Sequence, residues 1–163
     1  MIISIDCGLT GGIFRLKDDG SVIDYYRMPV ISIKKNGKDK KELDIKAARD
    51  LIKDADVVVM EKVWAYRGQG VSSIWTFGQM YGSLLGIIET LDKPLCLVTP
   101  QKWKTSYDFI VKGDTKKNQK KAAISQVREL LGDKKLTEGQ AESYLIGMHY
   151  IKTKVELKGL NDD

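Results

Sequence analysis

The first residues of the chain alternate short apolar runs with polar turns. The apolar runs cover residues 2–7, 11–17 and 21–27, and the breaks between them contain Gly-Leu-Thr-Gly and Asp-Asp-Gly. Apolar runs of this length, joined by glycine-containing turns, are typical of antiparallel strands. The pattern therefore predicts a three-stranded antiparallel meander at the start of the chain.

Helical spacing of apolar residues follows later in the chain. A first short helix is expected over residues 42–55, where one face carries Leu43, Ala47, Leu51 and Ile52. Further helices are expected over residues 72–92, 115–132 and 137–151. The lysine-rich residues 34–41, which precede the first helix, are expected to form a loop.

Two continuous apolar runs, residues 56–61 and 94–98, lie between these helices. Such runs are typical of strands that are buried on both faces. The elements then follow the order β-β-β-α-β-α-β, with two more helices, which predicts a mixed α/β fold. A chain of 163 residues suits a single domain. We place it at residues 1–155 and expect residues 156–163 to form a disordered tail.

This order of elements determines which strand ends meet. Right-handed crossovers place strands 2–7 and 56–61 side by side and parallel, so their carboxyl ends emerge at the same edge. Asp6 and Glu61 occupy those two ends. Because neighbouring strands are about 4.8 Å apart, the two carboxylates can reach a common ion. This edge of an open α/β sheet is also where ligands usually bind.

The last predicted helix carries a second pair of acids. Glu138 and Glu142 are four residues apart and share a helical face, beside an apolar stripe that contains Ala141, Leu145 and Met148. Like charges at this spacing repel each other, and a cation between them would offset that repulsion. The alternative is that both side chains face water. The combination with the two strand-end acids favours a cation site.

The net charge of +5 is concentrated in one segment. Residues 101–121 hold seven lysines and two aspartates, and the rest of the chain has 20 basic and 20 acidic residues. The lysines of residues 34–41 form a second cluster, which nearby acids partly balance. Either cluster alone is also compatible with a solvated face. Two clusters in a chain with a pI of about 9.1 favour a polyanionic partner.

The composition also limits the possible metal chemistry. The single histidine, His149, cannot build a histidine site, and the two cysteines, Cys7 and Cys96, lack zinc-site spacing and are expected to be buried free thiols. A catalytic metal would therefore need oxygen ligands. No apolar run approaches the ~18 residues that span a bilayer, and no basic start leads into an apolar stretch. We expect a cytoplasmic protein with no membrane partner.

Four segments, ISIDCGLTGG, VVVMEKVW, SSIWTFGQMYGSLLGII and EGQAESYLIG, occur in this order over about residues 1–150. Together they resemble the RuvC family of junction-resolving endonucleases, particularly its phage-encoded members. The resemblance implies a ribonuclease-H-like fold with a mixed five-stranded sheet flanked by helices. It also implies a homodimer that resolves four-way (Holliday) junctions, and other branched DNA, with two Mg²⁺ or Mn²⁺ ions per active site. A phage-encoded member would act in the bacterial host cytoplasm.

In that family the acids lie on the first strand, on the fourth strand and, as a pair, on the final helix. The resemblance assigns these roles of catalytic residue and metal ligand to Asp6, Glu61, Glu138 and Glu142. The chain departs from the family at Cys7, where proline is common, and in its helix acids, which are often aspartates. Members with helix acids three residues apart would point to Gly139 in place of Glu138, and Asp133 is a further substitute.

The segment KVWAYRGQGVSS after the fourth strand combines aromatic residues, an arginine and glycines. An aromatic on such a loop can stack on an unpaired base, a contact worth about 1–3 kcal/mol. The family carries an aromatic that probes the junction core at the position of Trp64, and the alternative for Trp64 is packing over the sheet edge. The candidate DNA contacts are Trp64, Tyr66, Arg67, Lys102, Lys104, Lys117, Lys120 and Lys121. Of these, Lys104 and Lys117 match family positions, and the other lysines are assigned by charge.

Glycines suggest two further features. Gly8, Gly11 and Gly12 are expected to form a tight turn that keeps bulky side chains away from DNA. Gly78, Gly82 and Gly86 recur at every fourth position of helix 72–92. They would allow close approach of a second helix and are the expected dimer contact, although they could equally pack on the sheet.

Two other functions fit parts of the sequence. A nucleic-acid-binding module with a degenerate, inactive site would explain the charge clusters and the glutamates in place of aspartates. An ATPase lobe of the actin-like or sugar-kinase type would use ISIDCGLTGG as a phosphate loop. Such ATPases need two lobes and a longer chain, which disfavours this second alternative. An active junction-resolving endonuclease remains the main hypothesis because all four acidic positions are filled.

Overall fold

The computed structural model describes residues 1–35 and 37–159, with side chains as far as residue 154. Its five-stranded sheet has the order β3-β2-β1-β6-β7. The strands are β1 (Ile2–Asp6), β2 (Gly12–Leu16), β3 (Val22–Arg27), β6 (Val57–Glu61) and β7 (Leu95–Val98). The first three are antiparallel neighbours, and β6 and β7 run parallel to β1. The predicted mixed sheet is confirmed.

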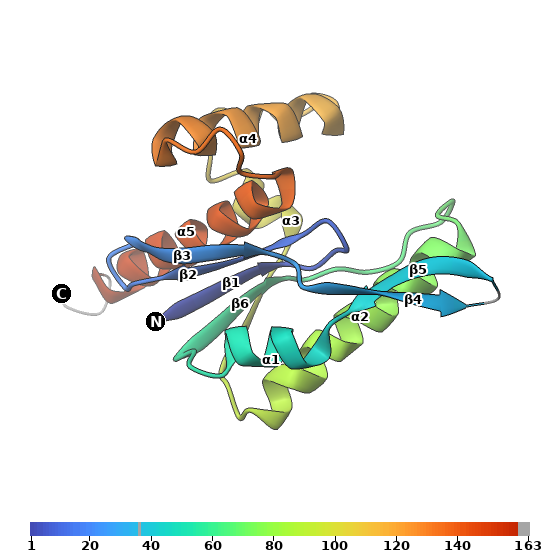
Figure 1. Ribbon diagram of the computed structural model, residues 1–163. Coiled ribbons are helices and arrows are strands. Elements are labelled where there is room, and N and C mark those ends of the chain that lie inside the picture. The colour runs from blue at the N-terminus through green and yellow to red at the C-terminus, as the bar shows by residue number, and fades with distance from the viewer. Residues whose placement is uncertain (36, 160–163) are drawn as a thin grey trace.

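Helices cover both faces of this sheet (Figure 1). They are α1 (Ile45–Ile52), α2 (Val71–Thr90), α3 (Pro100–Lys104), α4 (Lys116–Leu131) and α5 (Glu138–Gly159). Side chains alternate along β1, so Ile2 packs into one core with α4 and α5, whereas Ile3 and Ile5 pack into a second core with α1 and α2. The sheet therefore separates two apolar cores. None of the described helices is long and apolar enough to cross a membrane.

Helix α5 lies directly on β1 and β2, and glycines permit the close contact. A Cβ atom on Gly139 would come within 2.3 Å of the Thr10 carbonyl oxygen, and one on Gly12 within 2.6 Å of the Gln140 Cα. A bridge between Gly11 and Gly139 joins the turn after β1 to the start of α5. Gly11 and Gly12 therefore allow α5 to pack closely on the sheet, and the expected role of this turn in keeping space for DNA stays a prediction.

The lysine-rich segment forms a hairpin, and the prediction of a loop over residues 34–41 was wrong. The hairpin consists of β4 (Val30–Lys35) and β5 (Lys38–Leu43), which make a separate two-stranded sheet. Gly37, with a φ of 72°, lies in the turn between them. The β-branched residues in VISIKK favour a strand, but the lysines around them obscured this signal.

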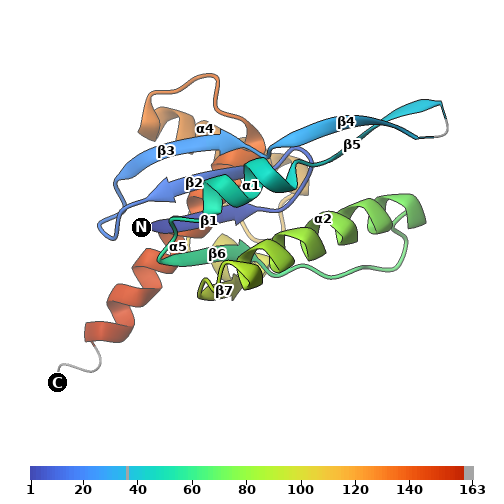
Figure 2. The ribbon, with the colours of Figure 1, turned by 60° about the horizontal axis from the view of Figure 1, so that its bottom comes forward.

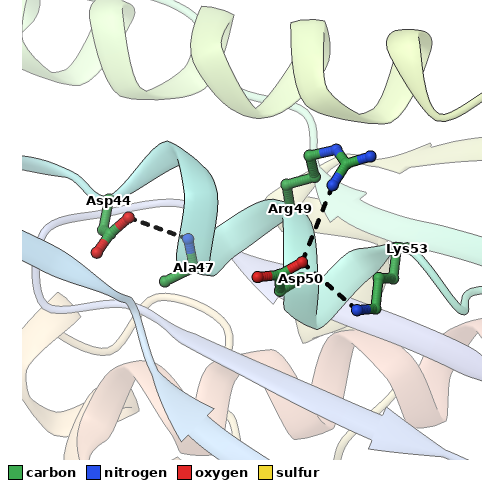
Figure 3. Close-up of polar contacts among 5 residues, drawn as sticks. All are labelled: Asp44, Ala47, Arg49, Asp50 and Lys53. Carbon is green, nitrogen blue, oxygen red and sulfur yellow. Dashed lines mark hydrogen bonds and ion pairs between the residues drawn. The ribbon is translucent and has the colours of Figure 1, made fainter.

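Helix α1 begins at Ile45 because Asp44 caps it, accepting a 3.0 Å hydrogen bond from the Ala47 amide (Figure 3). Leu43, which was predicted to lie on this helix, ends β5 instead. The buried helical residues are Ala48 and Ile52. The buried face of α1 is therefore rotated by one residue along the helix relative to the predicted face.

Several other boundaries differ from the sequence predictions. Helix α3 was not predicted, and β7 is an edge strand on which Leu95 and Leu97 remain partly exposed. Helix α5 continues to Gly159, past the expected end of the domain at residue 155. Residues 160–163, the rest of the expected tail, lie outside the described residues.

Candidate active site

Two carboxylates meet at the edge where β1 and β6 end. The strands are parallel and in register, with Ile5 beside Met60, so Asp6 and Glu61 follow at adjacent strand ends. This confirms the arrangement that the crossover rule predicts. Both acids lie in apolar strands that the cores hold in place, so their backbone positions are fixed by the fold.

Helix α5 brings the second pair of acids to the same edge. Thr137 and Gln140 form a capping box at its start: the Gln140 Oε1 accepts from the Thr137 amide at 2.8 Å and from the Thr137 hydroxyl at 2.9 Å. One turn further on, the Ser143 hydroxyl donates to the Ser4 carbonyl at 2.7 Å. These contacts hold the first turns of α5 on β1, with Glu142 beside the strand ends.

A pocket of about 310 Å³ opens at this edge. Its walls come from the ends of β6, α3, α4 and α5, from α2 and from the loop between β6 and α2. The lining residues are Glu61, Val63, Trp64, Tyr66, Gln69, Phe77, Pro100, Lys104, Lys116, Lys120 and Glu142. Two predicted acids, two predicted aromatics and two predicted lysines therefore surround one cavity.

The carboxylates of this cluster are held in an unfavourable environment. Burial raises the pKa of Asp6 well above its ordinary value, and the nearby charges of Glu142 and Glu61 raise it further. Burial also raises the pKa of Glu61 and of Glu142. Asp6, Glu61 and Glu142 thus form one mutually repelling group, the arrangement that marks functional sites more often than structural ones.

Lysines supply the opposing positive charge. Lys120 of α4 forms an ion pair with Glu138, and its charge also lowers the pKa of Asp6, Glu61 and Glu142. Partial burial works against the charged form of Lys120, yet the hydrogen bond to Glu138 and the charges of Glu142, Glu138 and Asp6 give it a net raised pKa. Lys120 is therefore the centre of positive charge in the cluster.

Trp103 orients Glu61. Its indole Nε1 donates a 2.8 Å hydrogen bond to the Glu61 Oε1, and the ring is buried in the core beneath the site. The hydrogen bond favours the ionised carboxylate and partly opposes the effect of burial on the pKa of Glu61. Sequence reasoning missed this role, because residues 61 and 103 meet only when β7 and α3 complete the edge of the sheet.

The structure distinguishes the helix acids and their substitutes. Glu142 is mostly buried within the cluster, whereas the Glu138 side chain is 48% exposed and paired with Lys120. Gly139 has no space for any side chain. Asp133 accepts a 2.6 Å hydrogen bond from the Tyr25 hydroxyl and another from the Lys135 amide. Its carboxylate is therefore engaged in contacts outside the acidic cluster. Glu142 is therefore the better placed of the helix acids.

The predicted DNA contacts divide into two groups. Trp64, Tyr66, Lys104 and Lys120 line the pocket, whereas Arg67, Lys102, Lys117 and Lys121 are exposed outside it. The rings of Trp64 and Tyr66 lie 5.9 Å apart, and Trp64 is 48% exposed, which argues against simple packing over the sheet edge.

Three polar or aromatic pocket residues, Gln69, Phe77 and Lys116, were missed from the sequence. For Lys116 a signal existed: Lys116 and Lys120 continue the buried stripe of Ala123 and Val127 along α4, so both must point toward the body of the protein. Lys117 and Lys121 lie on the neighbouring face. The helical period therefore separates the inward lysines from the outward ones.

The carboxylate oxygens of the cluster suit a hard divalent cation, although the side chains are not arranged around a common point where one could bind. Within residues 1–35 and 37–159, no group of three or more histidine, cysteine, aspartate or glutamate side chains is arranged to hold a metal ion. The cluster nevertheless consists of carboxylates whose repulsion lysines offset only in part, and such oxygen donors are what Mg²⁺ and Mn²⁺ prefer. Asp6, Glu61 and Glu142 are the residues that would hold such an ion.

The site is thus a carboxylate cluster at the carboxyl edge of a mixed five-stranded sheet. A scan of protein-family models and a search of curated protein sequences found no match. Among solved structures, RuvC of Thermus thermophilus matches with 16% identity and a TM-score of 0.53, over 95% of this chain and 96% of that one. T. thermophilus RuvC in complex with a Holliday junction substrate matches with 14% identity and a TM-score of 0.53, over 94% of each chain.

A third match is the yeast mitochondrial Holliday junction resolvase Ydc2, with 12% identity and a TM-score of 0.47 over 97% of this chain and 80% of that one. The likeness to the two T. thermophilus structures shows that this chain has the fold of RuvC. The fold implied by the four sequence segments is therefore confirmed.

The buried carboxylates lead to a pH-dependent stability. A raised pKa means that the folded state holds the proton more tightly than the unfolded state, so ionisation of Asp6, Glu61 and Glu142 destabilises the fold. This cost is absent below the unfolded pKa values and grows as the pH rises through the raised ones. In EDTA we expect Asp6→Asn to have a higher melting temperature than wild type near pH 8. This gap between the two melting temperatures should close near pH 4.

Thermal unfolding followed by circular dichroism measures this gap, which should be several degrees, because 1 kcal/mol corresponds to about 2–4 °C for a domain of this size. Glu129→Gln, on the exposed face of α4, is the matched control and should show no such gap. An Asp6→Asn gap that is constant with pH would contradict the account.

Proposed function

We propose that this protein is a metal-dependent endonuclease that resolves four-way (Holliday) DNA junctions, and other branched DNA, by paired phosphodiester hydrolysis. The observation that carries the proposal is the meeting of Asp6, Glu61 and Glu142 at the carboxyl edge of a RuvC-like sheet, beside lysines that can receive phosphates. Cleavage of a synthetic four-way junction, compared with a linear duplex of the same sequence, tests it.

The side chains have distinct tasks in this proposal. Asp6, at the rigid end of β1, would hold the Mg²⁺ or Mn²⁺ ions, two per active site, together with Glu61 and Glu142, assisted by Glu138. When bound, such ions activate a water and stabilise the leaving 3′ oxygen. The Trp103 hydrogen bond keeps the Glu61 carboxylate oriented and favours its ionised form. Burial of the cluster limits its access to bulk water and strengthens its hold on cations.

Lysines of the pocket would bind the scissile strand. Lys104, Lys116 and Lys120 line the cavity from two different helices, so they approach a phosphate from separate directions. Lys102, Lys117 and Lys121 are exposed beyond the pocket and would contact phosphates further along the DNA. Such contacts position the backbone without reading sequence.

Trp64 and Tyr66 are proposed to stack on bases that are unpaired at the junction core, with Arg67 contacting the neighbouring backbone. Their loop leads directly from Glu61 into the pocket. Trp64→Ala is expected to weaken junction binding by about 5- to 150-fold, from a stacking contribution of about 1–3 kcal/mol. Gel-shift titration with Asp6→Asn as the background measures this. Trp64→Phe should retain most of the affinity, and an equal loss on linear duplex would contradict a role at the core.

We further propose that the active form is a homodimer joined through α2. Gly78, Gly82 and Gly86 face away from the sheet, with nothing within 4 Å of a Cβ placed on any of them. This open surface supports a contact with a second helix over packing on the sheet. Trp75, on the same face, is 67% exposed. A second helix could approach this surface closely and bury the ring.

Gly82→Leu is accordingly expected to convert a dimer to a monomer, because the side chain would separate the two helices. Sedimentation equilibrium measures the mass, and Lys152→Leu, on the exposed side of α5, serves as the matched control. A wild-type protein that sediments as a monomer at micromolar concentration would refute the dimer.

One observation favours a second candidate function. Because the described side chains do not preform a metal group, a branched-DNA-binding module without activity remains an alternative, and binding without cleavage would identify it. The ATPase alternative gains no support from Gly11 and Gly12, whose backbone contacts α5 and which therefore have a structural role without a nucleotide.

A further inference from the structure

The β4–β5 hairpin is a strongly charged feature that the proposed active site leaves unused. It carries five lysines against two acids, namely Lys34, Lys35, Lys38, Lys40 and Lys41 with Asp39 and Glu42. All seven side chains are exposed. Within the described part of the hairpin, none of them takes part in an ion pair. The hairpin therefore presents a net charge of +3 that the protein itself does not neutralise.

Strand direction places this charge on the side of the carboxylates. The pairs Asp6–Gly12 and Gly12–Arg27 put the end of β3 level with Asp6, and β3 runs in the same direction as β1. The chain enters β4 at Val30, and Figures 1 and 2 show the hairpin continuing beyond this end of the sheet. A six-residue strand spans about 20 Å, which equals the rise of about six base pairs of DNA.

The base of the hairpin is anchored and its outer part is not. Leu43 is buried in the core that includes α2, and Val30 packs against the same core. The Asp44 amide donates to the Pro29 carbonyl at 3.0 Å and closes the base. Beyond this point the hairpin buries little, and a two-stranded hairpin alone is only marginally stable in water. The outer part of the hairpin therefore projects as an arm, and packing against the protein core does not account for its presence.

The register gathers lysines on one face of this arm. Lys35 lies opposite Lys38, and Lys40 lies opposite Ile33 two pairs further in, on the same side of the hairpin. Like charges directly opposite each other destabilise a strand pair. A bound polyanion would reverse that cost. The aliphatic part of Lys40 can cover the half-buried Ile33 while its ammonium group stays in water.

We propose that the β4–β5 hairpin is a second DNA-binding element, which holds the phosphate backbone of a duplex arm outside the junction core. This inference rests on the proposed function, since it takes the bound polyanion to be the DNA substrate. Lys35, Lys38 and Lys40 are the main contacts. The hairpin thus adds affinity and fixes the direction in which an arm leaves the active site, and it takes no part in the chemistry.

A triple neutralisation, Lys35→Gln/Lys38→Gln/Lys40→Gln, tests the proposal in the full chain. We expect binding to a linear duplex and to a four-way junction to weaken by about 10-fold or more at 0.1 M salt, and the magnitude of the slope of log K against log salt to fall by about 2.7, at about 0.9 for each lost phosphate contact. Cleavage at sub-saturating protein should fall in proportion to the loss of binding, because the hairpin holds the DNA without touching the reacting atoms. The triple arginine variant should bind as wild type does.

The matched control is Lys53→Gln/Lys93→Gln/Lys152→Gln, which removes the same charge from positions outside both the hairpin and the pocket. It should leave the salt slope almost unchanged. Equal effects of the two triple variants would overturn the proposal, because net charge alone would then explain the loss. Binding to both DNAs as tight as wild type would also overturn it.

Lysines on open strand edges also prevent edge-to-edge association. A neutralised hairpin that self-associates in light scattering, with its DNA affinity unchanged, would assign the lysines to that role and refute DNA binding. The duplex-binding measurement does not require cleavage. A protein that binds duplex through the hairpin but cuts no junction would therefore contradict the proposed function and still support the arm.

Discussion

Asp6→Asn is expected to lower the rate of junction cleavage by about 1,000-fold or more, equivalent to about 4 kcal/mol of transition-state stabilisation. Asp6 stands at the end of β1, and the nearby charges of Glu142 and Glu61 both raise its pKa, so its loss should disrupt the proposed metal site most. An amide of the same size keeps the shape of the site but loses the negative charge.

Binding should respond in the opposite way. Asp6→Asn removes a negative charge beside the lysines of the pocket, so we expect junction affinity equal to or higher than that of wild type. Single-turnover cleavage and gel-shift titration measure the two quantities on the same preparation. Calorimetric titration with Mn²⁺ adds a readout without DNA and should show loss of metal binding. Wild-type cleavage by Asp6→Asn would eliminate the carboxylate cluster as the catalytic site.

Glu142→Gln is expected to reduce cleavage by about 100-fold or more, whereas Glu138→Gln should reduce it by less than about 10-fold, a difference of at least 1.4 kcal/mol. Glu142 is mostly buried beside Asp6 and Glu61, but Glu138 is half-exposed and paired with Lys120. The two substitutions make the same chemical change four residues apart on one helix. They therefore control for each other.

The comparison also determines the role of Lys120. If Glu138 serves mainly to hold Lys120, then Lys120→Met and Glu138→Gln should weaken DNA binding to a similar degree, and the double variant should show little further loss. Equal losses of cleavage from Glu138→Gln and Glu142→Gln, with binding intact, would instead show that Glu138 leaves Lys120 and joins the metal ligands. The rates of single-turnover cleavage at saturating protein distinguish the two cases.

The strand-end acids could be predicted because they depend on topology alone. The order of elements puts β1 beside β6, and Asp6 and Glu61 end those strands. Glu142 could be predicted because it flanks the apolar stripe of Ala141 and Leu145, which must face the sheet. These three positions follow from hydrophobic periodicity and from the handedness of crossovers.

Other parts of the site depend on contacts that no local pattern records. The hydrogen bond from Trp103 to Glu61 joins residues that are 42 positions apart, and a tryptophan in an apolar context predicts only burial. Gly139 looked like an alternative ligand position, but the Thr10 carbonyl occupies the space beside it. Such exclusions require the packing of α5 on the turn after β1.

The β4–β5 hairpin shows a different limit of prediction from the sequence. Its strands expose both faces over most of their length, so they lack the alternation of apolar and polar residues by which half-buried strands are found. Lysines on exposed strands resemble a loop in sequence. The same exposure that hid the hairpin makes its charge accessible to a polyanion.

The most direct test of the central claim is a cleavage assay on a four-way junction with each strand labelled in turn, in Mg²⁺ and in Mn²⁺, beside a linear duplex and the Asp6→Asn variant. The account predicts paired nicks at symmetry-related positions of two opposing strands, no cutting of the duplex, and binding without cutting by the variant. Junction binding by wild type without cleavage in either metal would contradict it. Cleavage of the linear duplex at the same rate would contradict it equally.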